Sequence, residues 1–553
     1  KHEKMLRAFN TLYAEYEIIK NLKFKTTFSY DYTTVKGEKW YDPRTSNGED
    51  ENGEVVKRIR EYKKMVWSNT LSYLTTFNNI HHLDFLAGYE IDDTYNDYLS
   101  GEAYNFTTPD KHAISNGMKT VSVGGSDSRY RLVSYLSRLN YDYKNKYYLG
   151  ASFRVDGSSR LHRDNRWGTF WSVSGAWRTI EEEFMQPVKD WLTDLRIRAS
   201  YGVNGTLPSD YFGYMGLSSI SGGYLEQPGI QMSQIANPNL KWETNYNMNI
   251  GLDFGFWDRL NFTIEYYTRT TKNLLMDCPV SMTTGFSSYL MNIGEVKNKG
   301  IELTINSTNI KIKDFNWNTT FNLGHNSNKV VKLDGEQTQI VSGTQIHKVG
   351  SSYRTFYVQE FAGINPETGN PLFYTNELDE NGNYIKEITE NSKNAQFIPY
   401  KHAEPTVNGG ISNSLRYKWL DLNFLFSYQF GGYSYDTWAQ KTEHGGYDSY
   451  ANIPTYYRDS WKKPGDQTNI EVYMPGKSSS VSMHKITSSR RIHSTDYFRL
   501  KNITFGITLP KEWTNKINIG NVRFYASASN LWTWAAYDNY DPEAVSAGSA
   551  TQT

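Results

Sequence analysis

The chain has 553 residues, with 59 Lys and Arg balancing 59 Asp and Glu, so its formal net charge is zero. A neutral chain lacks the overall attraction for phosphate backbones that nucleic-acid-binding proteins use, so nucleic acid is not an expected partner. No segment reaches the roughly 18 apolar residues of a membrane helix, and a single cysteine, Cys278, excludes a disulfide framework or a Cys-rich metal site.

Alternation of apolar and polar residues runs through the whole chain. From 242 to 256 nearly every even position is apolar, and the odd positions are polar or glycine, which is the period-two pattern of a β-strand with two unlike faces. This pattern predicts sixteen strands, in chain order at residues 12–19, 22–32, 65–77, 83–91, 129–142, 147–157, 168–177, 193–203, 242–254, 259–271, 299–309, 315–326, 407–417, 420–431, 495–508 and 521–531.

The lengths of the predicted connections favour a membrane barrel over a soluble sandwich, which also alternates. Short turns, as at 20–21 and 144–146, alternate with long connections such as 33–64, 92–128 and 432–494. Outer-membrane barrels show this alternation, and their strands need about 9–11 residues to cross the bilayer. Tryptophans near the predicted strand ends are candidates for the interfacial aromatic girdles: Trp67, Trp171, Trp177, Trp242, Trp257 and Trp419.

Strand direction gives a further expectation. If the short turns are periplasmic, the strand at 521–531 runs upward and the chain stops in a long-side loop at Thr553. A barrel closed in lipid leaves no unpaired edge, so we expect one further downward strand and several strands before Lys1. Length alone would suggest several domains, but one pattern spans the chain, and we predict a single, incomplete barrel domain over 1–553.

Several segments resemble the SusC/RagA family of TonB-linked outer-membrane transporters. The resemblance rests on seven motifs spread over most of the chain: FRVDGS (153–158), LRIRASYGVNGT (195–206), NPNLKWETNYNMN (237–249), GEVKNKGIE (294–302), GINPETGNP (363–371), DYFRLKN (496–502) and ASNLW (528–532). It implies a 22-stranded barrel, of which about sixteen strands lie here, and an N-terminal plug and a final strand that this sequence does not contain.

The resemblance also implies a function and partners. Members of this family take glycans or peptides across the outer membrane of Bacteroidota, under a SusD-like surface lipoprotein that acts as a lid, with force supplied by the TonB complex. We therefore expect an active importer in the bacterial outer membrane, contacting lipid, lipoprotein, TonB and an oligosaccharide or peptide, and able to form a dimer of transporter–lipoprotein pairs.

The residues predict no enzyme. There is no phosphate-binding glycine loop and no HExxH motif, so we expect no catalytic residues, no cofactor and no metal site. An acidic stretch, Glu90, Asp92, Asp93 and Asp97, leaves a calcium ion open as an alternative to an exposed acidic loop. Residues 379–383 (DENGN) begin like a calcium loop but lack the glycine that it needs at position six, so a hairpin turn is expected there.

Aromatic residues in the long connection 432–494 are the candidates for contact with substrate or lid. They are Tyr435, Trp438, Tyr447, Tyr456, Tyr457 and Trp461. Flat rings stack on sugar faces, and a tyrosine adds a hydroxyl group; the same rings also serve to pack a loop on itself. Packing of the loop or lid is favoured over substrate contact.

Two alternatives from other classes remain open. A passive porin or structural barrel would share the strands but lack a plug and a TonB box upstream. A secreted all-β carbohydrate-binding protein would share its apolar strand faces between two sheets and would dissolve without detergent.

Overall fold

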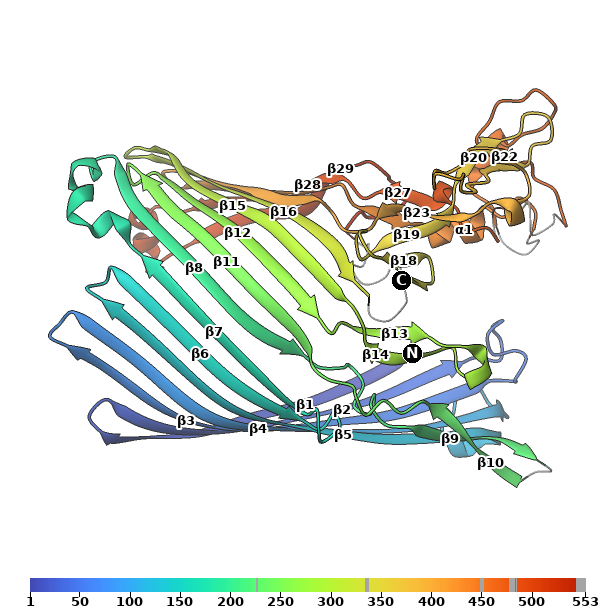
Figure 1. The fold of residues 1–553 in the computed structure, drawn as a ribbon, viewed down its shortest axis with the longest axis horizontal. Coiled ribbons are helices and arrows are strands. Elements are labelled where there is room, and N and C mark those ends of the chain that lie inside the picture. The colour runs from blue at the N-terminus through green and yellow to red at the C-terminus, as the bar shows by residue number, and fades with distance from the viewer. Residues whose placement is uncertain (225–226, 334–337, 448–451, 477–482, 484, 544–553) are drawn as a thin grey trace. The chain divides into compact units, whose positions relative to one another are not determined.

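The computed structural model describes residues 1–224, 227–333, 338–447, 452–476, 483 and 485–543. Sixteen strands hydrogen-bond in one antiparallel sheet, in the order β1-β2-β3-β4-β5-β6-β7-β8-β11-β12-β15-β16-β24-β25-β28-β29 (Figure 1). Their bounds are β1 His2–Ile19, β2 Leu22–Tyr41, β3 Glu54–Phe77, β4 His81–Phe106, β5 Gly117–Tyr143, β6 Tyr147–Ser158, β7 Trp167–Trp177, β8 Leu192–Thr206, β11 Glu243–Phe256, β12 Leu260–Lys272, β15 Glu295–Lys311, β16 Phe315–Lys332, β24 Val407–Tyr417, β25 Leu420–Phe430, β28 Tyr497–Thr508 and β29 Arg523–Ala535.

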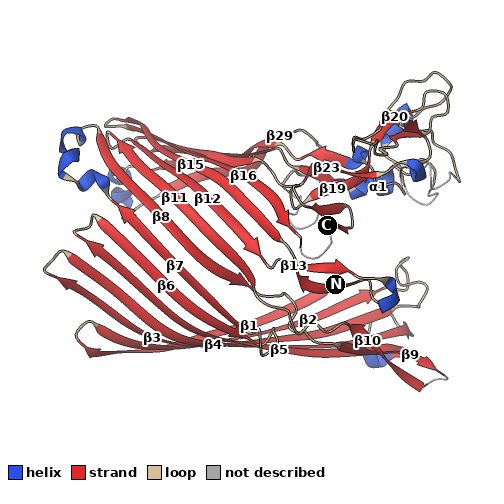
Figure 2. Cartoon of the chain, in the orientation of Figure 1, coloured by secondary structure: helices blue, strands red, loops and turns tan. Residues whose placement is uncertain are grey.

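The long connections carry small elements of their own, and Figure 2 shows that helices are confined to the connections. Short strands there are β9 Leu217–Tyr224, β10 Gln227–Gln234, β13 Leu275–Pro279, β14 Ser288–Asn292, β17 Gln339–Ser342, β18 Gln345–Lys348, β19 Thr355–Gln359, β20 Phe361–Ile364, β21 Pro371–Tyr374, β22 Ile388–Thr389, β23 Phe397–His402, β26 Tyr433–Tyr435 and β27 Ile492–Ser494. The α-helices of the described residues are α1 (Thr437–Thr442) and α2 (Lys511–Thr514), and 3₁₀ helices span Ile114–Asn116, Thr179–Glu181, Glu183–Val188, Met282–Thr284, Ser392–Asn394, Thr455–Asp459, Ser489–Arg491 and Asn515–Ile517. None of the helices in the described ranges has the length and apolarity to cross a bilayer.

All sixteen predicted strands are confirmed, and each is one strand of the sheet. The fold class, all-β with antiparallel strands, is likewise confirmed. The first five strands, however, are longer than expected: the strand predicted at 83–91 is part of β4, His81–Phe106, and that at 65–77 is part of β3, Glu54–Phe77. The additional residues carry charges on both faces, so no apolar alternation marks them.

The chain packs as two compact units, which are described separately. The first comprises residues 1–178, 198–247 and 271–293, and the second comprises 179–197, 248–270 and 294–553. Buried clusters lie in each unit, in the connections and in the parts of the long strands next to them. In the first, one cluster joins Leu161, Phe170, Leu240 and Trp242 and another joins Val55, Ala103 and Phe106. In the second, one joins Phe356, Val358 and Tyr435 and another joins Phe373, Ala395, Met483 and Ile486.

Within the first unit, the two faces of the sheet differ in chemistry. On β4 every second residue from Leu83 to Ile91 is apolar. Two of the intervening residues of β4 are acidic and pair with arginines: Asp84 lies 3.2 Å from Arg138 of β5, and Glu90 lies 3.9 Å from Arg154 of β6. Nine residues of a tilted strand rise about 20–25 Å, which matches the apolar band of an outer-membrane barrel.

Several short turns have the backbone conformation that hairpins require. Positive φ angles occur at both central residues of three turns: 51° and 59° at Asn78 and Asn79, 55° and 53° at Lys144 and Asn145, and 52° and 54° at Trp257 and Asp258. Paired positive φ angles define the I′ geometry, whose twist matches that of the flanking strands. These three connections are short, as predicted, but the connections 178–191 and 509–522, which a strict alternation would also make short, are longer than a turn.

Trp242 corrects one expectation. We predicted it among the girdle residues at strand ends, but its side chain is only 8% exposed. Its ring packs edge-on against Phe170 at 5.2 Å, and its Nε1 donates a hydrogen bond to the Arg166 carbonyl at 3.0 Å. Trp242 precedes β11 and closes a core cluster. Trp67 lies within β3 and not at its end, since the strand extends eleven residues beyond the predicted start, and it is 44% exposed.

Candidate functional site in the aromatic loop

The connection between β25 and β28 contains the predicted aromatic residues, and residues 432–494 are called the aromatic loop below. Its two ends are joined by a short ladder, in which Tyr435 of β26 pairs with Ile492 of β27. Asp436 follows β26 and caps α1, because its Oδ1 accepts a hydrogen bond from the Ala439 amide at 2.8 Å. A capping carboxylate satisfies an amide that the helix itself leaves without a partner.

Tyr435 lies inside the base of the loop. It is 0% exposed and packs with Phe356 and Val358, while its hydroxyl donates to Gln440 Oε1 at 3.1 Å. Burial raises the pKa of Tyr435 to about 12. Its ring is occupied by packing within this unit.

Tyr456 and Tyr457 are held by two carboxylates. Tyr456 donates to Glu443, and the buried Tyr457 donates to Glu471 Oε1 at 3.4 Å. Burial raises the pKa of Tyr456 to about 12 and also raises that of Tyr457. Glu443 also forms an ion pair with Arg491, a side chain that is only 1% exposed, and burial lowers the pKa of Arg491 to about 10. The loop thus has a polar core of its own.

Trp461 is bound to another connection of the same unit. Its Nε1 donates to the Pro366 carbonyl at 2.7 Å, within the GINPETGNP motif. Gly369 of that motif has φ +70°, and a Cβ there would lie 2.6 Å from Trp461 Cδ2. The indole therefore fills the space that a side chain would need.

Trp438 and Tyr447 are the more accessible residues of the set. Trp438 is 60% exposed and Tyr447 is 37% exposed. A lysine lies beside each ring: Lys441 Nζ is 5.3 Å from the centre of Trp438, and Lys485 Nζ is 5.1 Å from that of Tyr447. Cations at this distance are attracted to the face of an aromatic ring.

A pocket of about 280 Å³ brings two of the six predicted residues together. Trp438 and Tyr456 line it with residues that sequence reasoning missed, Asn539 and Tyr540 among them; the lining is completed by Asp436, Ala439, Thr442 and Pro454. Asn539 and Tyr540 follow β29, about a hundred residues later in the sequence. The aromatic composition of residues 537–540 (YDNY) is a signal that could have drawn attention to them.

Tyr537 holds this later segment against the aromatic loop. Its hydroxyl donates to Asp436 Oδ2 at 2.7 Å, and its ring stacks on His493 with centroids 3.8 Å apart and planes 2° apart. Asp436, only 3% exposed, thus accepts from both α1 and Tyr537. The pocket offers ring faces and fixed amide and carboxylate groups, which suit a neutral polar ligand with an apolar face.

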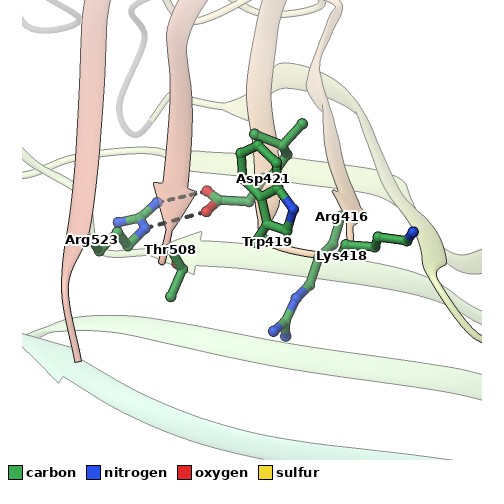
Figure 3. Close-up of a pocket in the computed structure, with 7 residues that line it drawn as sticks. Arg416, Lys418, Trp419, Asp421, Thr508 and Arg523 are labelled. Carbon is green, nitrogen blue, oxygen red and sulfur yellow. Dashed lines mark hydrogen bonds and ion pairs between the residues drawn. The ribbon is translucent and has the colours of Figure 1, made fainter. Parts of the chain in front are cut away.

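A second pocket of about 280 Å³ lies beside the short turn between β24 and β25 (Figure 3). Its labelled residues include Asp421 and Arg523, joined by an ion pair of 2.6 Å. Arg416, Lys418, Trp419, Leu420 and Thr508 complete the lining. Lys418 has φ +50° in the turn, and Trp419 is 42% exposed. The pocket belongs to the short-turn end of these strands, opposite the aromatic loop.

Within the acidic stretch, Glu90, Asp92 and Asp93 each pair with a basic residue, whereas Asp97 is exposed. Asp92 pairs with Lys64 at 2.7 Å, and Asp93 pairs with Arg129 and Arg131. Among the described residues no cluster of His, Cys, Asp or Glu has the arrangement of a metal site. Asp379 accepts the amides of Asn381 and Asn383 at 2.9 and 2.8 Å, so the DENGN segment is a turn, as predicted.

Comparison with known proteins identifies the family. A model of the family described as TonB dependent receptor-like, beta-barrel, matches residues 6–377. TonB-dependent receptor P3 of Formosa agariphila is 32% identical over 552 residues, covering 96% of this chain and 54% of its own length. TonB-dependent receptor SusC of Bacteroides thetaiotaomicron is 29% identical over 519 residues, covering 90% of this chain and 49% of its own.

A solved structure extends the match. The structure of the RagAB peptide transporter aligns with a TM-score of 0.88 and 26% identity, covering 99% of this chain and 60% of its own. The chain thus spans about half the length of the curated relatives it matches. It belongs to the TonB-dependent receptor β-barrel family, in its SusC/RagA branch, and is a protein of the bacterial outer membrane.

Proposed function

We propose that this chain forms barrel strands of an importer that takes up oligomeric nutrients, glycans or peptides, across the outer membrane at the expense of TonB-transmitted energy. The observation that carries the proposal is the alignment with the RagAB peptide transporter over 99% of the chain at a TM-score of 0.88. The long strands supply a wall for a conduit, and the proposed work is gating and translocation without covalent chemistry.

The proposal includes partners and contacts. The resemblance to SusC/RagA transporters supports a SusD-like surface lipoprotein as a lid, the TonB complex as the source of force, and pairing of two transporter–lipoprotein units. The exposure of Trp438 and Tyr447 supports contact of the aromatic loop with substrate or lid. The polar core beneath them, built around Glu443 and Arg491, supports a role in presenting these rings.

Uptake by cells tests the proposed function. Cells expressing the full-length protein receive fluorescently labelled oligosaccharides or oligopeptides, with TonB present or deleted. We expect labelled material of one of the two classes to reach the periplasm only when TonB is present. Entry that is equal without TonB would instead indicate a passive porin.

The partner is tested separately on the protein extracted from outer membranes in detergent. Native mass spectrometry is expected to show a complex with a lipoprotein. A protein that has no partner and stays in solution without detergent would contradict the proposal and favour a secreted carbohydrate-binding protein.

A further inference from the structure

Strands β4 and β5 change chemistry abruptly on their apolar face. Along β5 the alternate residues Tyr135 and Val133 are followed on the same face by Arg131 and Arg129. On β4, Ile91 is followed on the same face by Asp93. The register places Ile91 opposite Val133 and Asp93 opposite Arg131, so the change falls at the same point on both strands.

Asp93 gathers the two arginines into one site. Its carboxylate accepts Nε and Nη2 of Arg129 at 2.7 and 2.5 Å and Nε of Arg131 at 2.8 Å. The acid is 10% exposed, whereas the arginine side chains are 51% and 57% exposed. A guanidinium carries five N–H donors, so these bonds leave donors on both arginines directed away from the buried acid.

The height of this site above the apolar band decides which molecules it meets. A strand tilted by about 45° rises roughly 2.3 Å per residue, so Arg131 and Asp93, two residues past Val133 and Ile91, where the unbroken apolar alternation ends, lie about 5 Å above the band. The headgroup layer is about 5–8 Å thick on each side of the hydrocarbon. Arg129 starts about 9 Å above the band, but its guanidinium reaches down to Asp93. Both guanidiniums therefore lie at headgroup depth.

Carboxylates farther from the apolar band on the same face do not cancel the positive charge of Arg129 and Arg131 at headgroup depth. Asp97 and Asp127 face each other in register and are exposed. Asp127 lies six residues past Val133, about 14 Å above the apolar band and outside the headgroup layer. Outward from the apolar band, the net charge of this face is first basic and then acidic, with Tyr95 beside Arg129 and the exposed Leu99 beyond Asp97. The exposed Trp167 marks the same level on β7. It pairs with Gly157 of β6, and Gly157 pairs with Val133 of β5.

We propose that Arg129 and Arg131 bind the phosphate group of an outer-leaflet lipid headgroup on the outside of the sheet. Asp93 is a positioning residue, which holds the two guanidiniums side by side and lowers their net charge. Arginine forks match the oxygens of a phosphate, and the acyl chains of the same lipid would lie along Tyr135, Val133 and Ile91. The site is independent of the aromatic loop and of any nutrient.

Native mass spectrometry of the detergent-solubilised full-length protein tests the proposal. The probe is lipid A carrying both phosphates, compared with enzymatically dephosphorylated lipid A and with inorganic phosphate. We expect phosphorylated lipid A to bind at least about tenfold better than either comparison probe, because both phosphate and acyl chains contribute. If the dephosphorylated lipid bound equally well, the site would not recognise phosphate. If inorganic phosphate bound equally well, the ligand would not be a lipid.

Variants distinguish specific loss of the lipid site from misfolding of the protein. Arg129→Gln with Arg131→Gln is expected to lower lipid A binding about tenfold. Arg138→Gln, on the opposite face of β5, is expected to leave it unchanged; Arg138 is 52% exposed and pairs with Asp84. Asp93→Asn keeps an oxygen that accepts hydrogen bonds between the two arginines but removes the negative charge that competes with a phosphate. It is therefore expected to raise binding, and misfolding cannot produce that gain. A loss of binding with Asp93→Asn, or an equal loss with Arg138→Gln, would overturn the proposal.

Discussion

The indole of Trp461 lies directly against Gly369, and it occupies the space that a side chain at position 369 would need. Gly369 has φ +70°, a conformation that favours glycine, and the nearest atom to a hypothetical Cβ is Trp461 Cδ2 at 2.6 Å. The two residues are 92 positions apart in the sequence, so this contact fixes the aromatic loop to the GINPETGNP turn. The hydrogen bond from Trp461 Nε1 to the Pro366 carbonyl completes the attachment.

Gly369→Ala is expected to loosen this attachment. A left-handed alanine costs about 1–2 kcal/mol and the overlap with Trp461 about 1–3 kcal/mol more. The Val472 amide, which donates to the Gly369 carbonyl at 2.9 Å, should then exchange its hydrogen at least about tenfold faster. Gly465→Ala is the matched control, because Gly465 has φ +92° but no atoms within 4 Å of a Cβ. Equal acceleration at Val472 in both variants would show that packing against Trp461 contributes nothing.

Tyr537→Phe tests the link between the segment after β29 and the aromatic loop. The variant keeps the ring stacked on His493 but removes the hydrogen bond to the buried Asp436 carboxylate. Hydrogen bonds to charged groups contribute about 1.5–3 kcal/mol, so hydrogen exchange of the amides of α1 should accelerate at least about tenfold. Tyr537→Ala should accelerate it further. Unchanged exchange in Tyr537→Phe would show that the stacked ring alone holds the segment.

Acid should release the same region through His493. Burial, reinforced by Arg491 and Arg490, lowers the pKa of His493 to about 4, although Asp436 opposes the shift. The folded state therefore holds a neutral imidazole, and the unfolded state takes up a proton below its ordinary pKa of about 6.5. This contribution to stability is complete above about pH 6.5 and is lost as the pH falls toward 4.

Exchange protection of the β26–β27 amides, corrected for intrinsic rates, measures this loss between pH 7 and pH 5. His493→Phe keeps a ring against Tyr537 without a titrating group, so its protection should vary less with pH. The same fall in both proteins would assign the effect to groups other than His493.

The sheet was predictable because each strand crosses a band where apolar and polar residues must alternate. From Leu83 to Ile91 that pattern is visible in the sequence, and it marks the part of β4 that faces hydrocarbon. Beyond Ile91 the strand continues to Phe106 through residues such as Asp92 and Asp93, whose charges are balanced by Lys64 and Arg129 on neighbouring strands. Cross-strand ion pairs are invisible in one strand's sequence, so the predicted strand stopped with the apolar pattern.

The aromatic loop was predictable in composition but not in arrangement. Tyr435 and Trp438 are three residues apart and equally aromatic, yet one is 0% and the other 60% exposed. The difference arises because β26 pairs with β27, which buries Tyr435 against Phe356, whereas α1 turns Trp438 outward. Tyr540 reaches the same pocket from beyond β29, and no local pattern connects it to Trp438.

Trp438→Ala distinguishes the roles proposed for the aromatic loop. Exposed aromatic anchors contribute about 1–2 kcal/mol or more to the free energy of binding at an interface. Loss of the ring should therefore lower the affinity for its partner about tenfold. If the ring contacts substrate, uptake of the labelled oligomer falls while the lipoprotein still co-purifies. If it contacts the lid, the fraction of complex in native mass spectrometry falls as well. Trp513→Ala is the matched control, since Trp513 in α2 is 58% exposed and lies outside the loop. If uptake and complex formation in Trp438→Ala matched those of the wild type, Trp438 would contact neither substrate nor lid, and its role would be to pack the loop.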